Sequence, residues 1–214
     1  MPYNKVIFVD GDGTCRSAMI RIIMKSKFLL YPVEFESRGM VVLFPEPLDA
    51  KAYAVLNAYG YTLDDIPARQ LMQEDIKDDV LILTMEDRQK LKIWETFENA
   101  RHVYTLAEFI HYSGDILPLY GEPVESYEEW VVKMDRLLDE LVIHLNELSI
   151  RDSAAGKKKE TQPKRGVQSQ QVGEIPENGY ENFQQPKAVV GETIKQDKEE
   201  TPDGRKKDGL SDLG

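Results

Sequence analysis

The chain has 214 residues, of which 41% are hydrophobic, and its formal net charge is −11 at pH 7. This length and composition suffice for one domain with a hydrophobic core and an additional segment. The acidic balance argues against binding to nucleic acid or anionic membranes, and the single cysteine excludes an internal disulfide and fits a reducing compartment.

No apolar run approaches the roughly 18 residues that a membrane-spanning helix needs, and the first residues lack the pattern of a secretory signal. We therefore expect a cytoplasmic monomer that contacts neither membrane nor nucleic acid. Residues 1–150 contain 15 Lys or Arg and 26 Asp or Glu, whereas residues 151–214 contain 12 of each and show no apolar periodicity. The sequence thus predicts a folded domain over 1–150 and a disordered polar tail over 151–214.

The first stretch of the chain combines a strand, a loop with two glycines and a helix. Four consecutive apolar residues, β-branched or aromatic, predict a buried parallel strand over residues 4–9. Gly11 and Gly13 permit a tight loop, and Ser17 is expected to cap an apolar helix over residues 17–29. This order directs backbone N–H groups and the positive end of a helix dipole at an anion.

The loop itself has the composition of a phosphate-binding loop. Arg16 supplies a guanidinium that can hold two phosphate oxygens at once. The helix terminus and Arg16 are also expected to lower the pKa of the Cys15 thiol and make it sensitive to oxidation. The loop residues are Gly11, Asp12, Gly13, Thr14, Cys15, Arg16 and Ser17.

The rest of the first 150 residues alternates strands with helices. This alternation favours an α/β fold with a four-stranded parallel sheet and helices on both faces. Ligands of such folds bind at the carboxyl ends of the strands, where the loop after the first strand lies. The apolar run over 40–44 either extends the second strand or forms a loop wall. The further expected elements are a strand over 33–37, a helix that Pro47, Leu48 and Asp49 open and Gly60 ends, a strand over 80–85, a helix over 86–99, a strand over 102–106 and an amphipathic helix over 130–148.

Several motifs, in this order along the chain, resemble those of the low-molecular-weight protein tyrosine phosphatase family. Residues 10–17 have the outline of the family's loop, in which five residues separate a cysteine from an Arg-Ser pair. Residues 68–71 (Ala-Arg-Gln-Leu) and 84–87 (Thr-Met-Glu-Asp) are similar to two further family segments. Thr14 stands at the position associated with phosphoarginine preference in the bacterial branch that includes the arginine phosphatases. The resemblance covers about residues 3–148 and implies the family's fold and a protein tyrosine or arginine phosphatase activity.

Two positions depart from the pattern that this resemblance implies. Asp10 stands where the family has its nucleophilic cysteine, and aligning Tyr120 and Gly121 with the family's aromatic residue and glycine puts Pro118 at the general acid. Proline has no proton to donate. The resemblance therefore implies a degenerate phosphatase in which Arg16 remains as the phosphate clamp and Tyr120 walls the pocket. Such a protein would act by binding a phosphorylated or acidic ligand, or a protein, and needs no cofactor.

We hypothesise that the Asp10 carboxylate takes the place of the phosphate. A fixed negative charge at the loop would repel a bound phosphate. Each pair of like charges ~4 Å apart costs about 4 kcal/mol of binding free energy at an effective dielectric near 20. Asp10 would accept the loop's N–H hydrogen bonds and pair with Arg16, so that the loop is filled by one of its own side chains.

Two alternatives remain open at this point. Residues 8–14 also resemble the signature of haloacid-dehalogenase-type phosphatases, in which Asp10 would be the nucleophile and Asp12 the acid/base. Mg²⁺ would then be held by Asp10, Asp12 and Asp87. In the other alternative, the folded part is a protein-interaction module and the tail over 151–214 binds partners.

Overall fold

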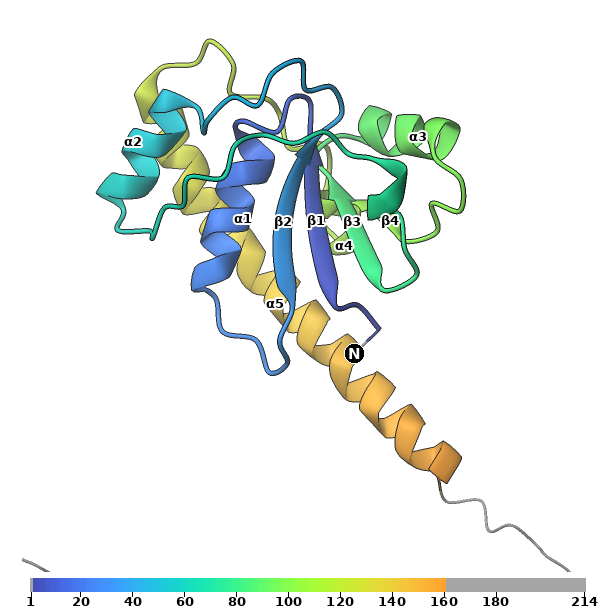
Figure 1. Ribbon diagram of the computed structural model, residues 1–214. Coiled ribbons are helices and arrows are strands. Elements are labelled where there is room, and N and C mark those ends of the chain that lie inside the picture. Colours follow the sequence, from blue (N-terminus) through green and yellow to red (C-terminus); the bar gives the residue numbers. More distant parts are fainter. Residues whose placement is uncertain (1, 161–214) are drawn as a thin grey trace, which may run out of the picture. The chain divides into compact units, whose positions relative to one another are not determined.

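Four parallel strands form the central sheet of the computed structural model (Figure 1). The structure describes the backbone of residues 2–160 and the side chains of residues 2–154. The order across the sheet is β2-β1-β3-β4, so β1 has a neighbour on each side and β2 is an edge strand. The strands are β1 (Lys5–Asp10), β2 (Glu34–Gly39), β3 (Val80–Thr84) and β4 (Val103–Thr105).

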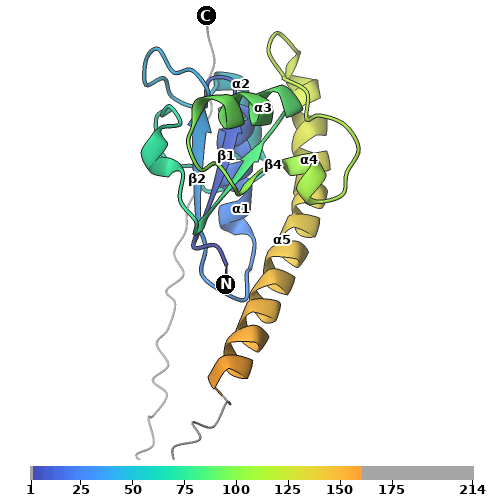
Figure 2. The same ribbon diagram turned by 90° about the vertical axis from the view of Figure 1, so that its right-hand side faces the viewer.

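Helices cover both faces of this sheet. α1 and α5 lie on one face, and α3 lies on the other (Figures 1 and 2). The predicted α/β fold with a four-stranded parallel sheet is thereby confirmed. Among the described residues, no helix combines the length and the apolar character needed to cross a membrane. The helices are α1 (Arg16–Ser26), α2 (Ala50–Ala58), α3 (Asp87–Thr96), α4 (Leu106–Phe109) and α5 (Val124–Glu160), with a 3₁₀ turn over Gln73–Asp75.

Strand β1 is buried on both faces because each face meets a separate apolar cluster. Phe8 belongs to a cluster that includes Met19 of α1 and Leu141 of α5. Ile7, one residue earlier, belongs to the opposite cluster with Ile93 of α3. Successive side chains of a strand point to opposite faces, so a strand covered on both sides requires the unbroken apolar run seen in the sequence. The loop that follows β1 therefore starts from a rigid, fully buried strand.

The expectation that Ser17 caps the first helix is wrong. α1 begins at Arg16, with Cys15 as the N-cap residue, and Cys15 makes no side-chain capping hydrogen bond. Ser17 is fully buried, and its Oγ has no hydrogen-bond partner among the described residues. The backbone N–H of Ser17 instead donates to Oδ2 of Asp10 at 3.0 Å. The side chain that serves the helix terminus therefore comes from the preceding strand.

Other element boundaries also differ from the expectations. Of the two alternatives left open for the run over 40–44, the structure has the loop: the run does not extend β2, and its Leu43 and Phe44 are exposed. The last helix starts at Val124, before the stretch whose periodicity predicted it, and continues beyond residue 150 to Glu160. Most of the predicted tail, residues 161–214, lies outside the described residues.

Gly39 is the point at which β2 passes closest to the loop after β1. A Cβ atom added there would lie 2.4 Å from the carbonyl carbon of Asp12 and 2.7 Å from Cγ2 of Val42. We therefore expect Gly39→Ala to lower the free energy of unfolding, measured in urea, by about 1–3 kcal/mol or more, the usual cost of overpacking. Gly11→Ala is the control, since a Cβ at Gly11 meets nothing within 4 Å. Equal losses in the two variants would contradict this prediction.

Candidate functional site

The loop after β1 lies at the carboxyl end of the sheet, against the segment that follows β2 (Figure 1). The N–H of Met40 donates to the carbonyl oxygen of Asp10 at 2.9 Å. Gly13 has a φ of 79°, and a Cβ atom there would lie 2.9 Å from the backbone nitrogen of Gly39. This left-handed conformation and close approach both require glycine. The loop is thereby held in one shape by its contacts with the neighbouring strand.

The Asp10 carboxylate turns back into this loop and fills it. Oδ1 accepts a hydrogen bond from the N–H of Gly13 at 2.7 Å, and Oδ2 accepts one from the N–H of Ser17 at 3.0 Å. Asp10 is only 1% exposed. Backbone N–H groups at the start of a helix are the groups that bind anions in phosphate loops. The hypothesis that an internal carboxylate takes up the loop's donors is confirmed by these two contacts.

Burial changes the titration of this carboxyl group. It raises the pKa of Asp10 above the ordinary value of 3.8, while the N–H of Ser17, the positive charge of Arg16 and the N–H of Gly13 act in the lowering direction without cancelling it. A carboxyl whose pKa is higher in the folded than in the unfolded chain binds its proton more readily when folded. Its stabilising contribution is therefore fully present below the unfolded pKa and disappears as the pH rises through the folded one.

This raised pKa predicts a pH-dependent difference between the chain and its Asp10→Asn variant. Asparagine does not ionise, so the variant does not lose stability when the buried carboxyl would give up its proton. As the pH rises from about 4, we expect the free energy of unfolding of the parent chain to fall relative to that of the Asp10→Asn variant. Urea unfolding across this range measures the shift, with Asp12→Asn as the control for an exposed carboxylate of the same loop. A difference that is constant with pH would show that the pKa of Asp10 is not raised.

Arg16 is buried and is held by partners outside the loop. Its Nη2 lies 2.8 Å from Oε1 of Glu86, and its Nη1 donates to the carbonyl oxygen of Ile116 at 2.5 Å. Glu86 also forms an ion pair with Arg88, at 2.6 Å. The expected pairing of Arg16 with Asp10 is therefore wrong: its carboxylate partner among the described residues is Glu86. Burial acts to raise the pKa of Glu86, but Arg88 and Arg16 together hold it below its ordinary value.

The expectation of a lowered pKa for Cys15 is wrong. Burial raises the pKa of its thiol to about 12, and the negative charges of Asp10 and Asp49 add to this effect, whereas the positive charge of Arg16 only partly opposes it. The thiol is partly buried and lies 4.0 Å from Sδ of Met19. A thiol with so high a pKa carries almost no thiolate at neutral pH, which disfavours the sensitivity to oxidation expected from the sequence.

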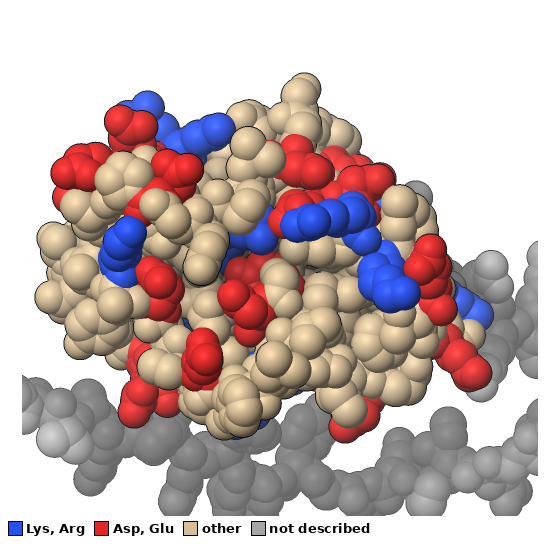
Figure 3. Space-filling view, turned by 90° about the horizontal axis from the view of Figure 1, so that it is seen from above, with Lys and Arg blue, Asp and Glu red and all other residues tan. Residues whose placement is uncertain are grey.

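The tip of the loop is stabilised by a second carboxylate. Oδ1 of Asp12 accepts hydrogen bonds from the N–H of Thr14 at 3.0 Å and from its Oγ1 at 2.8 Å. Asp12 itself is exposed. Seen from this end of the molecule, acidic side chains lie around a hollow in the surface, with Lys or Arg side chains beside them (Figure 3). The exposed carboxylate of Asp12 is therefore the negative charge that an approaching anion meets at the tip of the loop.

Pro118 and Tyr120 lie in the segment between α4 and α5. Both are exposed, Tyr120 to 97%. Ile116, in the same segment, is buried and provides the carbonyl that binds Arg16. Asp115 is also exposed, and its Oδ1 accepts a hydrogen bond from the N–H of Asp87 at 3.0 Å, at the start of α3. The roles assigned to Pro118 at the acid position and to Tyr120 as a pocket wall remain predictions.

The three carboxylates considered for Mg²⁺ do not form a metal site. Both oxygens of Asp10 accept backbone N–H hydrogen bonds, Oδ1 of Asp12 accepts from Thr14, and Asp87 pairs with Lys90 at 2.9 Å. In the described part of the chain, no group of three or more His, Cys, Asp or Glu side chains is arranged to hold a metal ion. Mg²⁺ requires near-octahedral oxygen ligands, and these side chains do not fit it.

Two groups bind Arg16 at the site without having been predicted as its partners. The sequence places Glu86 directly after a buried strand, but no local pattern connects its carboxylate with Arg16. The carbonyl of Ile116 lies 100 residues away from Arg16 along the chain. A backbone carbonyl has no sequence signal at all, so only the packing of the loop before α5 onto α1 could reveal this contact.

Comparisons with known proteins cover the same part of the chain. The family model described as low molecular weight phosphotyrosine protein phosphatase matches residues 5–152. The low molecular weight protein-tyrosine-phosphatase PtpB of Staphylococcus aureus is 29% identical over 139 residues, which are 63% of this chain and 97% of that protein. PtpB of Staphylococcus haemolyticus is 25% identical over 137 residues, covering 64% of this chain and 96% of that protein.

Solved structures show the same likeness. The crystal structure of a low molecular weight protein tyrosine phosphatase from T. tengcongensis has 33% sequence identity and a TM-score of 0.60, and the match covers 64% of this chain and 97% of the other. The YwlE arginine phosphatase from Geobacillus stearothermophilus has 29% identity and a TM-score of 0.64, covering 70% and 97% of the two chains. The residues matched by the family model, 5–152, include the loop after β1, all four strands and the helices up to residue 152 of α5.

Proposed function

The chain belongs to the low-molecular-weight phosphotyrosine protein phosphatase family, and we propose that it is a degenerate member that acts by binding and not by hydrolysis. The observation that carries this proposal is the position of the Asp10 carboxylate, which accepts the N–H hydrogen bonds of Gly13 and Ser17. These are donors that a phosphate group would need. A loop that is already occupied by its own anion has neither the room nor the charge for a second one.

The chemistry of the family requires three groups that this chain supplies only in part. A nucleophile must attack phosphorus, donors must hold the phosphate oxygens, and an acid must protonate the leaving group. At the nucleophile position, Asp10 is buried and hydrogen-bonded. At the donor position, Arg16 is neutralised by Glu86 and tied to the carbonyl of Ile116. Losing the general acid alone typically lowers the rate of hydrolysis by about 10²–10⁴. Pro118 at the acid position therefore supports a loss of activity of this size, and the changes at Asp10 and Arg16 would lower the rate further.

A protein is the ligand that these features favour over a phosphate. The exposed carboxylate of Asp12 repels phosphate groups at the tip of the loop. Next to the loop, Val41, Leu43 and Phe44 expose apolar side chains, as does Leu117. Exposed apolar residues rimmed by polar ones are typical of protein interaction surfaces. The scaffold of the phosphatase would thus serve as a rigid frame for recognition.

A hydrolysis assay tests this proposal directly. The purified full chain is incubated with a phosphotyrosine peptide and a phosphoarginine peptide, with Mg²⁺ and with EDTA, beside a Staphylococcus PtpB as positive control. We expect phosphate release by the control and none above background by this chain under either condition. Circular dichroism on the same sample establishes that the chain is folded.

The same assay on Asp10→Asn separates the alternatives. Turnover by the parent chain that disappears in this variant would overturn the proposal, because it would make Asp10 a working nucleophile. If that turnover also required Mg²⁺, it would favour the aspartyl-phosphate mechanism in spite of the arrangement of the carboxylates.

A further inference from the structure

We propose that the open edge of β2 binds an extended peptide of a partner protein as an additional strand, with an apolar side chain at one end and a carboxylate at the other. This site lies beside α1 and β2 and shares no residue with the loop after β1, so it goes beyond the proposed function and does not depend on it. The argument starts from the backbone of β2.

The backbone groups at this edge are only partly used. At Gly39 they are engaged, because its N–H donates to the carbonyl of Arg69 and its carbonyl accepts from the N–H of Leu71, both at 2.9 Å. In a strand, every second residue points its N–H and carbonyl to the same side, so Phe35 and Ser37 face the same edge as Gly39. The carbonyl of Ser37 accepts from Nη1 of Arg38. No hydrogen bond within the described part of the chain uses the N–H groups of Phe35 and Ser37 or the carbonyl of Phe35.

The segment that pairs with Gly39 leaves the remaining edge uncovered. It forms a single parallel bridge between Gly39 and Gln70. Before this bridge the chain turns away from the sheet, since the N–H of Ala68 donates to the carbonyl of Glu46. A short segment therefore already pairs with this edge at one bridge, and the space in line with it, beside Phe35 and Ser37, is left for an added strand.

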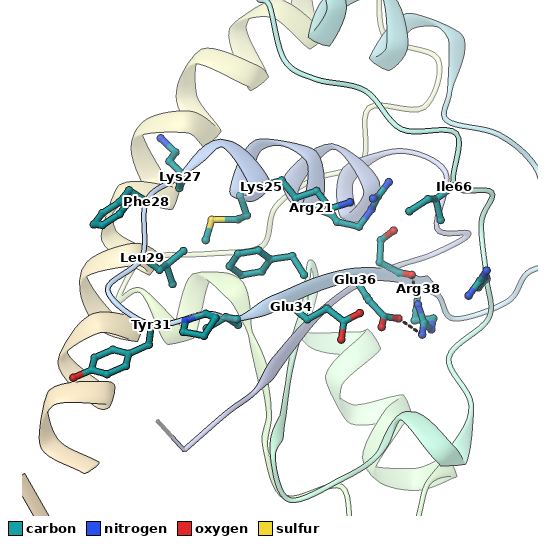
Figure 4. Close-up of a pocket in the computed structure, with 16 residues that line it drawn as sticks. Arg21, Lys25, Lys27, Phe28, Leu29, Tyr31, Glu34, Glu36, Arg38 and Ile66 are labelled. Atoms are coloured by element: carbon teal, nitrogen blue, oxygen red, sulfur yellow. Dashed lines mark hydrogen bonds and ion pairs between the residues drawn. The ribbon is translucent and has the colours of Figure 1, made fainter. Parts of the chain in front are cut away.

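This space is a groove of about 650 Å³ between α1, β2 and the segment around Ile66 (Figure 4). Phe28, Leu29 and Tyr31 lie together at one end, and Ile66 and Arg38 lie at the other (Figure 4). Phe28 is 81% exposed. The first end therefore offers an apolar contact, in which a partner's side chain would cover surface that is otherwise in water.

The charged groups of the groove determine which residue fits its second end. Most cations of the whole groove are already paired: Arg21 and Lys25 with Asp64, Arg38 with Asp75 and Glu36, and Lys27 with Asp135 and Asp139. The guanidinium of Arg69 is exposed and forms no hydrogen bond or ion pair with another residue that the structure describes. An unpaired guanidinium beside an open strand edge fits a carboxylate.

The charged side chains of β2 lie along the groove. Glu36 and Arg38 pair in register with Ile7 and Val9 of β1, but both residues also line the groove, and Nη1 of Arg38 occupies the carbonyl of Ser37. Among the described residues, the backbone groups left open to a peptide are therefore the N–H groups of Phe35 and Ser37 and the carbonyl of Phe35. Phe35 pairs with Val6 and faces α1. Because the groove is walled by α1 and by the segment around Ile66, a single extended chain enters it more easily than the edge of a second folded copy does. These features together favour a peptide of a partner over self-association.

The test uses the full ¹⁵N-labelled chain and two synthetic peptides of about seven residues, the length that spans the strand at roughly 3.3 Å per residue. One peptide carries valine and isoleucine in one half and glutamate in the other, and the second replaces glutamate with lysine. We expect the first peptide to protect the amides of Phe35 and Ser37 from hydrogen exchange and to bind about tenfold more tightly than the second. Absence of protection with both peptides would overturn the proposal.

Two variants locate the binding. Ser37→Pro removes a donor that points out of the sheet, a position where an edge strand tolerates proline, and is expected to weaken binding by about tenfold. Ser37→Ala is its control and should bind normally. Arg69→Glu, at an exposed position, keeps the test valid if the proline variant does not fold, and it should reverse the preference between the peptides.

The remaining outcomes also decide the proposal. Unchanged binding by Ser37→Pro and Arg69→Glu would place the peptide elsewhere and contradict it. Protection of the Phe35 and Ser37 amides before any peptide is added would show that the edge is already occupied. If that protection grows with protein concentration, the occupant is a second copy. Phosphatase activity plays no part in these readouts, so they fail or succeed independently of the hydrolysis assay.

Discussion

Replacing Asp10 with serine is expected to raise the affinity of the chain for inorganic phosphate by about two orders of magnitude. The substitution removes the carboxylate that accepts the N–H hydrogen bonds of Gly13 and Ser17, so both donors become available to an added anion. It also removes the negative charge that repels the phosphate. For two like charges ~4 Å apart, this repulsion is about 4 kcal/mol at an effective dielectric near 20. Each 1.4 kcal/mol is a factor of ten. We expect only part of this gain because Arg16 stays bound to Glu86.

Isothermal titration calorimetry with phosphate measures this affinity, and the parent chain should show no binding in the millimolar range. Asp12→Ser is the matched control, because it removes an exposed carboxylate from the same loop, where solvent screens the charge. Its affinity should rise by no more than about threefold. If Asp10→Ser is folded and binds phosphate no better than Asp12→Ser does, the account of Asp10 as the internal anion is wrong.

The substitution Glu86→Gln is expected to lower the free energy of unfolding by about 3–5 kcal/mol. Glu86 and Arg16 are both nearly inaccessible to solvent, and their side chains meet at 2.8 Å. Removing one partner of a buried ion pair leaves the other charge without compensation in a poorly solvated environment, which accounts for this magnitude. Glutamine keeps the shape of the side chain, so the loss reports the charge and not a cavity. Urea unfolding at neutral pH measures it.

Arg88 supplies the control for this experiment. It also pairs with Glu86, at 2.6 Å, but its side chain is 77% exposed. Exposed ion pairs contribute about 0–1 kcal/mol, so Arg88→Gln should have a small effect. A double variant with leucine at both Arg16 and Glu86 should be less destabilised than either single leucine variant, since no buried charge remains unpaired. Equal losses in Glu86→Gln and Arg88→Gln would show that the pair with Arg16 does not stabilise the fold.

The two carboxyl groups next to Arg16 show how burial and pairing compete. Burial acts to raise the pKa of both Asp10 and Glu86. The pKa of Asp10 stays raised although two N–H groups donate to it, whereas Glu86 has two guanidinium partners and its pKa is lowered. At Glu86 two ion pairs therefore outweigh desolvation, whereas at Asp10 two N–H donors and the charge of Arg16, with which it forms no ion pair, do not.

Much of the fold follows from local patterns in the sequence. The uninterrupted apolar run of β1, the apolar run of β3 and the spacing of three and four in α5 are properties of neighbouring residues. They predict which segments are strands and helices because the side-chain period of each element is a local geometric fact. The glycines of the loop, and Asp10 at its start, are likewise visible in the sequence. The resemblance to the phosphatase family rests on the order of such local motifs.

Only the tertiary structure decided what the groups of the site do. The partner of Arg16 is Glu86, and its second contact is a carbonyl 100 residues away. The sequence favoured a lowered pKa for Cys15 because a helix terminus and an arginine are its neighbours, but burial and the surrounding carboxylates raise it. Ion pairs and desolvation depend on which distant segments close over a group, and the free energy of a charge depends on that surrounding medium. The residues of the loop were therefore predictable from the sequence, whereas their ionisation and pairing required the folded chain.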